Sequence, residues 1–230
     1  MALPIVIASG QLLTAALWRP LIDAWPNREV ILADNRSDDT ISGCAIRLLD
    51  NAPPRFVLVA HALGGFVAFE VMRRAPERVA KLVLIATLAP ADGPAQTARR
   101  QGYIDLVESG RFDQVVEERI PILFPESKRG DPYLVGLARK MAADTGQEIF
   151  LAQQRAIMAR IDSRPSLAEI TIPVLLIRGA EDGITNQAQQ DEMLALLPHA
   201  RLETIAGAGH LPMIEVPEVL APMIARFIDS

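Results

Sequence analysis

The segment spanning residues 55–88 constrains the fold of this 230-residue chain more than any other stretch. Residues 56–60 form a short apolar run rich in Val, which is typical of a strand buried on both faces. Residues 63–74 then carry apolar side chains at helical spacing, and residues 81–86 form a second apolar strand. A strand, a sharp turn, a helix and another strand in this order predict a parallel sheet covered by helices.

The chain on either side of this segment repeats the alternation of strands and helices. Four further strands are predicted at residues 3–8, 29–33, 172–177 and 201–205. Helices are predicted at residues 14–25, 41–50, 185–197 and 213–228, with Asp38 and Thr40 as candidate N-caps for the second helix. This order predicts an α/β protein with a mostly parallel sheet and helices on both faces.

Residues 91–167 interrupt the alternation, because they contain no strand pattern. Helical patterns cover residues 95–109, 111–123, 131–143 and 147–161, and Gly and Pro residues separate them. We therefore expect a core built from residues 1–90 and 168–230, with residues 91–167 inserted as a helical unit.

Composition and charge argue against several classes of partner. The net charge of −5 provides no basic patch, so we do not expect nucleic acid as a partner. A lone cysteine, Cys44, excludes an internal disulfide and a cysteine-based zinc site, and we expect it to be buried. The apolar N-terminus lacks the basic region of a signal peptide, and no segment is long and apolar enough to span a bilayer. We expect a cytoplasmic protein, and the sequence carries no signal for its oligomeric state.

The turn at residues 60–65, with sequence AHALGG, resembles the nucleophile elbow of the α/β-hydrolase superfamily, in its esterase and haloperoxidase-like branch. The family pattern is G-x-S-x-G, and Ala62 stands where the family carries its nucleophile. An alanine methyl group can neither attack a carbonyl carbon nor hold a proton. The two antiparallel strands that usually open this fold have no counterpart before residue 3, so we expect a form with a shortened N-terminus.

Two later loops resemble the parts of the family that deliver the other catalytic groups. Residues 179–182 resemble the G-x-x-D turn, which implies Asp182 as the acid, and residues 207–210 resemble the G-x-G-H loop, which implies His210 as the base. The resemblance also implies an oxyanion hole formed by the backbone N–H groups of Gln11 and Leu63.

The other two histidines are expected outside this set. We expect His61 to point away from the substrate and His199 to be exposed. Arg160 and Arg178 could meet a substrate carboxylate, but ion pairs at the surface or within the helical unit are the simpler expectation for both.

The resemblance implies hydrolysis of an ester, lactone, thioester or amide, with no metal or organic cofactor, and a helical cap at residues 91–167. The expected partner is a small apolar ester-like substrate. Three interpretations remain open for Ala62. The chain can be a Ser-His-Asp hydrolase that is inactive because its nucleophile is alanine. It can also be a natural member that uses the His210–Asp182 dyad for proton transfer, or a non-catalytic receptor for a small molecule.

Overall fold

A sheet of six parallel strands forms the centre of the computed structural model, which describes residues 2–230. Within this range the strands lie in the spatial order β2-β1-β3-β4-β5-β6. Their bounds are β1 Ile5–Ala8, β2 Val30–Leu32, β3 Phe56–His61, β4 Val79–Ile85, β5 Val174–Gly179 and β6 Ala200–Ile205. All six strands predicted from the sequence are therefore confirmed, with small shifts of their ends.

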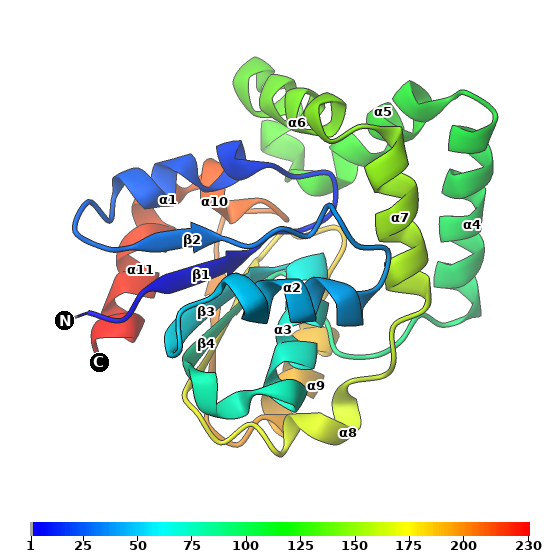
Figure 1. Ribbon diagram of the computed structural model, residues 1–230. Helices are drawn as coiled ribbons and strands as arrows, with labels where there is room; N and C mark the ends of the chain where they lie inside the picture. Colours follow the sequence, from blue (N-terminus) through cyan, green and yellow to red (C-terminus); the bar gives the residue numbers. More distant parts are fainter. Residues whose placement is uncertain (1) are drawn as a thin grey trace.

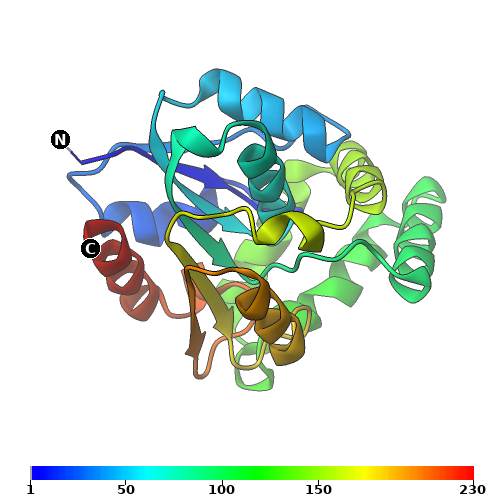
Figure 2. The ribbon, with the colours of Figure 1, turned by 90° about the horizontal axis from the view of Figure 1, so that it is seen from below.

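Helices cover both faces of the sheet (Figures 1 and 2). One face is covered by α2 (Ile41–Asn51), α3 (Leu63–Arg74), α8 (Arg164–Leu167) and α9 (Gln187–Leu196). The other face is covered by α1 (Arg19–Asp23), α10 (Pro212–Glu215) and α11 (Pro217–Asp229). The described part of the chain, residues 2–230, also has three short 3₁₀ helices: η1 (Ala15–Trp18), η2 (Pro76–Arg78) and η3 (Glu126–Lys128). The predicted α/β class with helices on both faces is confirmed.

The four inner strands, β1, β3, β4 and β5, are largely buried on both faces of the sheet, to which their successive side chains point in turn. In β1, Ile5 and Ile7 join the core beneath α1 and α11, whereas Val6 and Ala8 join the core beneath α2 and α3. None of these four side chains is more than 1% exposed. This explains why the inner strands read as mostly continuous apolar runs rather than as alternating ones.

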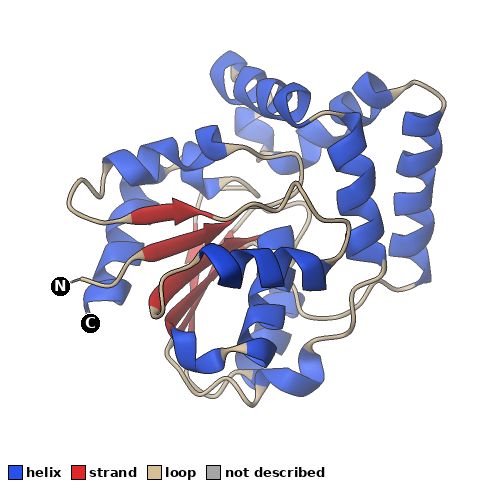
Figure 3. Ribbon diagram, in the orientation of Figure 1, coloured by secondary structure: helices blue, strands red, loops and turns tan. Residues whose placement is uncertain are grey.

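Residues 91–167 contain helices and loops but no strand, as predicted (Figure 3). Within this range α8 packs against the sheet, and the four longer helices are α4 (Pro94–Glu108), α5 (Phe112–Leu123), α6 (Pro132–Thr145) and α7 (Gln147–Met158). Figure 1 shows them gathered beyond the arrowheads of the strands, which is the end where the loops after parallel strands meet.

Two predicted helices are divided in the structure, and proline accompanies both divisions. The helix expected at residues 213–228 is α10 followed by α11, because Val216, just before Pro217, takes a non-helical conformation with φ −149° and ψ 51°. The helix expected at residues 14–25 is η1 followed by α1, with Pro20 in the first turn of α1. Thr40 caps α2 as predicted, since its side chain accepts a hydrogen bond from the backbone N–H of Gly43.

Candidate active site

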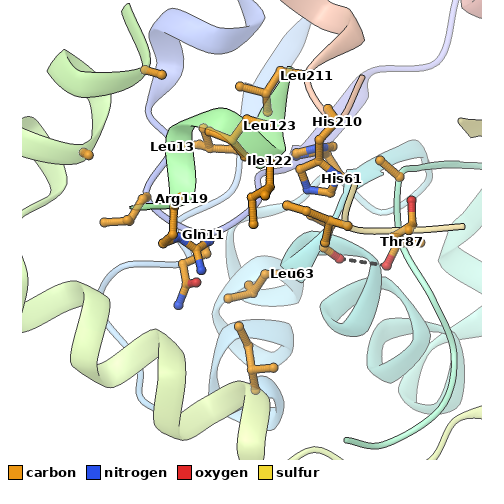
Figure 4. A pocket seen from close by; sticks show the side chains of 18 of the residues that line it. Gln11, Leu13, His61, Leu63, Thr87, Arg119, Ile122, Leu123, His210 and Leu211 are labelled. Carbon is orange, nitrogen blue, oxygen red and sulfur yellow. Dashed lines mark hydrogen bonds between the residues drawn. The ribbon is translucent and has the colours of Figure 1, made fainter. Parts of the chain in front are cut away.

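Ala62 occupies the turn between β3 and α3 in a strained backbone conformation. Its φ is 50° and its ψ is −113°, which L-residues with a side chain rarely adopt. The backbone is held on both sides, because the Ala62 N–H donates to the Ile85 carbonyl at 3.0 Å and the Thr87 hydroxyl donates to the Ala62 carbonyl at 2.8 Å (Figure 4). A surrounding structure that enforces such a turn is typical of functional sites.

Two glycines allow the start of α3 to approach the sheet. A Cβ on Gly64 would lie 2.0 Å from the carbonyl oxygen of Ala8, and one on Gly65 would lie 2.2 Å from Oγ1 of Thr87. Neither distance is physically possible, so only glycine fits at these two positions. The close approach brings the N-terminus of α3 against the carboxyl end of β1.

Asp182 and His210 meet beside this turn. The Nδ1 atom of His210 lies 3.0 and 3.1 Å from the two carboxylate oxygens of Asp182. The same carboxylate accepts hydrogen bonds from the Thr185 hydroxyl and from the N–H groups of Ile184 and Thr185. Burial raises the pKa of Asp182, but the charge of His210 and these hydrogen bonds outweigh it and lower the pKa to about 2. Its neighbour Glu181 is exposed.

Three hydrogen bonds to two residues hold the loop that carries His210. The N–H groups of Gly209 and Leu211, on either side of His210, both donate to the Glu215 carboxylate at 2.8 Å. The His210 N–H donates to the carbonyl of Leu123, at the end of α5, at 2.8 Å. Burial raises the pKa of Glu215, and the two N–H donors act against this effect.

His61 lies beside the cavity at Ala62, and its ring is fully buried. Nε2 of His61 lies 2.9 Å from the carbonyl oxygen of His210 and therefore donates to it, which leaves Nδ1 without a hydrogen. The two imidazole rings are 4.9 Å apart between centroids. Burial, assisted by the charge of His210, lowers the pKa of His61 to about 3. His61 is therefore neutral, and it supports the loop of His210. His199 is exposed, as predicted.

Ala62 and His210 face one cavity, whose volume is about 110 Å³. Figure 4 shows Gln11, Leu63 and His210 around it. The walls are mostly apolar, and side chains of α4, α5, α6 and α7 complete them. A small apolar pocket with a few polar groups is the usual form of a site for a small molecule.

The loop after β1 brings Gln11 to this cavity. Leu12 takes a positive φ of 59°, and its N–H donates to Oε1 of Gln153 in α7 at 3.1 Å. The Nε2 atom of Gln11 is buried, and no described residue accepts a hydrogen bond from it. Leu63, the residue that follows Ala62, is the first residue of α3 and lines the same cavity.

The two arginines that the sequence offered as possible carboxylate partners are engaged elsewhere. Arg160 is buried, forms an ion pair with Asp92 at 2.8 Å and stacks on the ring of Phe66 at 4.2 Å. Arg178 is also buried, so the expectation of a surface position is wrong, and it donates to Oε1 of Gln187 at 3.1 Å. Neither side chain is among the described residues that line the cavity.

The sequence reading missed three polar residues of this region: Glu215, Thr185 and Arg119. Glu215 had a detectable signal, because it is the only charged residue in the run LPMIEV. Thr185 had none, since it lies in a polar stretch, and Arg119 had none, since it follows two glutamates and reads as the solvated face of a helix.

Within residues 2–230, no group of three or more His, Cys, Asp or Glu side chains is arranged to hold a metal ion. None of the helices in this range has the length and apolar character needed to cross a membrane.

The parallel sheet, the strained turn after β3 and the Asp–His pair after β5 and β6 together define an α/β hydrolase. Residues 5–223 match the alpha/beta hydrolase family, and the chain belongs to that family. The predicted fold is thereby confirmed.

Similar proteins include a pimeloyl-acyl-carrier-protein methyl ester esterase of Nitrosomonas europaea, 30% identical over 74% of this chain and 70% of that protein. A protein of Azorhizobium caulinodans named as a carbamate hydrolase is 27% identical over 97% of this chain and 90% of its own length. Among solved structures, a thermophilic esterase of Thermogutta terrifontis with bound malate superimposes with a TM-score of 0.90. It is 25% identical, and the match covers 100% of this chain and 90% of the esterase.

Proposed function

We propose that this protein has the active site of a carboxylic-ester hydrolase in which position 62 is the nucleophile position, occupied by alanine. The observation that carries the proposal is the His210–Asp182 pair, with Nδ1 3.0 Å from the carboxylate, in a cavity that Ala62 also lines. The hydrolases and esterases among the similar proteins support the same reaction class. With alanine at position 62, the chain lacks the attacking oxygen and is inactive towards esters.

The proposed mechanism applies to a chain with serine at position 62. Its Oγ attacks the ester carbonyl carbon while Nε2 of His210 takes the hydroxyl proton, and Asp182 stabilises the imidazolium through Nδ1. The N–H groups of Gln11 and Leu63 donate to the oxyanion of the tetrahedral intermediate. Collapse of this intermediate expels the alcohol, which receives the proton from Nε2. Water then attacks the acyl-enzyme by the same steps and releases the acid.

Residues 91–167 are proposed to act as a cap, and residues 1–90 and 168–230 as the hydrolase core. The lining of the cavity supports this division, because α4 and α5 contribute Tyr103, Ile120 and Ile122 to its walls. The hydrogen bond from the His210 N–H to the Leu123 carbonyl ties the two units together at the site. The proposed mechanism needs no metal or organic cofactor.

The test is to restore the nucleophile. The Ala62→Ser variant should hydrolyse p-nitrophenyl butyrate on the order of 10⁴–10⁶-fold faster than the unchanged chain. Combining Ala62→Ser with His210→Ala should return the rate close to the starting level, because nucleophile and base act as a unit. A fluorophosphonate should label the Ala62→Ser variant covalently and leave the unchanged chain unlabelled.

An Ala62→Ser variant that is neither labelled nor active on short-chain esters, thioesters or lactones would overturn the hydrolase proposal. In that case the unchanged chain should be assayed for proton exchange at a carbon acid. Exchange that is lost in His210→Ala would indicate a Ser-less enzyme using the dyad, and binding without exchange would indicate a receptor.

A further inference from the structure

The cavity beside Ala62 carries an excess of positive charge. Three arginine side chains line it, and none of its described lining residues is Asp or Glu. Arg99 and Arg100 come from α4, and Arg119 comes from α5. Guanidinium groups stay charged throughout the physiological pH range. A pocket with apolar walls and one sign of charge attracts ligands of the opposite sign.

Arg100 is already paired within the protein. Its Nε donates to the Asp92 carboxylate, and its Nη1 donates to Oε1 of Gln154 at 3.0 Å. The same Asp92 forms the ion pair with Arg160. One carboxylate therefore serves two guanidinium groups, so this cluster leaves a net positive charge next to the cavity.

Arg119 has no corresponding carboxylate. Its guanidinium lies 5.7 Å from the ring centroids of both Tyr103 and Phe150, and no residue within 2–230 forms an ion pair with it or accepts a hydrogen bond from it. Burial lowers its pKa to about 10, so the group is still charged at neutral pH. The aromatic contacts orient the guanidinium but leave its N–H donors without acceptors. Arg119 is half-buried, so its unpaired charge faces the cavity, where a bound anion can pair with it.

A second side chain with an unpartnered donor belongs to the lining of the same cavity. Nε2 of Gln11 is buried and makes no hydrogen bond with any described residue. In the view of Figure 4, Gln11 and Arg119 lie on one side of the pocket, while His210 and Thr87 lie on the other. The side chains of Gln11 and Arg119 therefore lie at the end of the pocket away from the proposed catalytic base, His210.

We propose that this pocket takes esters that carry a free carboxylate at the end remote from the scissile bond, an inference that rests on the function proposed above. The guanidinium of Arg119 is the counter-ion, and Nε2 of Gln11 is a further donor to the carboxylate. The apolar side chains of Leu13 and Ile120 line the space for a carbon chain. The cavity volume of about 110 Å³ favours half esters of short dicarboxylic acids. The substrate is then not wholly apolar but has one acidic end.

The first test is binding to the unchanged chain, in which Ala62 prevents turnover. Calorimetry at low salt should compare monomethyl glutarate with methyl glutaramate, a neutral ligand of the same shape. The half ester should bind on the order of 10-fold more tightly than the amide, because only the half ester neutralises the guanidinium. Added salt should reduce this preference.

Substitutions at position 119 test whether the Arg119 side chain causes the preference for the half ester over the amide. Arg119→Met should abolish it, while Arg119→Lys should keep part of it because the charge remains without the planar fork. Arg139→Met is the matched control, since Arg139 is an exposed arginine of α6 whose partner is Glu117, and it should leave the preference unchanged.

Equal affinity for the two ligands, no measurable binding of the half ester, or a preference that survives in Arg119→Met would overturn the proposal. The binding test does not depend on catalysis, so its failure can be distinguished from failure of the hydrolase proposal. If Ala62→Ser is inactive but the unchanged chain still prefers the half ester through Arg119, the anion site stands. If Ala62→Ser is active and hydrolyses both ligands with equal kcat/KM, the anion site falls and the hydrolase proposal stands.

Discussion

The imidazole of His61 donates from Nε2 to the backbone carbonyl of His210, at 2.9 Å, and so connects the end of β3 to the loop after β6. Its ring is 0% exposed and lies between the indole of Trp18, at 6.4 Å, and the imidazole of His210, at 4.9 Å. Only a neutral His61 is compatible with this burial, because no described carboxylate contacts its free Nδ1.

This burial predicts a loss of stability on mild acidification. The folded-state pKa of His61 is about 3, below the ordinary value of 6.5, so between these values the unfolded chain binds a proton that the folded chain does not. Stability therefore falls as the pH falls below 6.5, by ~2 kcal/mol between pH 7 and pH 5 from this group. His61→Gln keeps an N–H donor for the His210 carbonyl and should show a correspondingly smaller loss in urea unfolding. His199→Gln, at an exposed position, should behave like the unchanged chain.

Asp182 should matter for catalysis in the restored enzyme. In the Ala62→Ser background, Asp182→Asn should lower kcat by about 10⁴-fold, because an amide no longer holds His210 in the tautomer that accepts the serine proton. Glu181→Gln is the matched control at the adjacent exposed carboxylate and should change kcat less than about twofold. Steady-state hydrolysis of p-nitrophenyl butyrate measures both. Similar losses in the two variants would contradict the assignment of Asp182 as the acid.

Glu215 is expected to position His210 without touching the substrate. Glu215→Gln offers one acceptor oxygen where the carboxylate offers two, so either the Gly209 or the Leu211 N–H loses its partner. We expect ~2 kcal/mol less stability, and in the Ala62→Ser background a lower kcat with an unchanged KM. Glu218→Gln, three residues later and exposed, should have neither effect. Thermal unfolding and the separate kcat and KM values provide the measurement.

The close approach of α3 to β1 predicts a large difference between two chemically identical substitutions. Gly64→Ala places a Cβ 2.0 Å from the Ala8 carbonyl oxygen, and should cost at least ~3 kcal/mol because backbone must move. Gly102→Ala in α4 meets nothing within 4 Å and should stabilise the chain by ~0.5–1 kcal/mol through helix propensity. Urea unfolding compares the two. A mild effect of Gly64→Ala would mean that the turn tolerates a wider geometry than the structure shows.

Much of the fold and part of the site could be predicted because the relevant signals are local. The Val-rich run of β3 and the glycines at positions 64 and 65 lie within ten residues of each other, and together they define a strand, a tight turn and a helix. The loops that carry Asp182 and His210 directly follow predicted strands. Because the carboxyl ends of parallel strands meet at one edge of a sheet, their approach was predictable as well.

The orientation of His61, the role of Glu215 and the exposure of Arg119 to the cavity were decided by the tertiary structure alone. Each depends on contacts between segments far apart in the sequence, such as His61 with His210. A local pattern records helix or strand periodicity, but it does not record which distant groups arrive beside a side chain. The sequence by itself thus determined the strands, the sharp turn after β3 and the candidate Asp–His pair. The packing of α5 and of the loop after β6 decided which polar groups face the cavity and which of them remain without a partner.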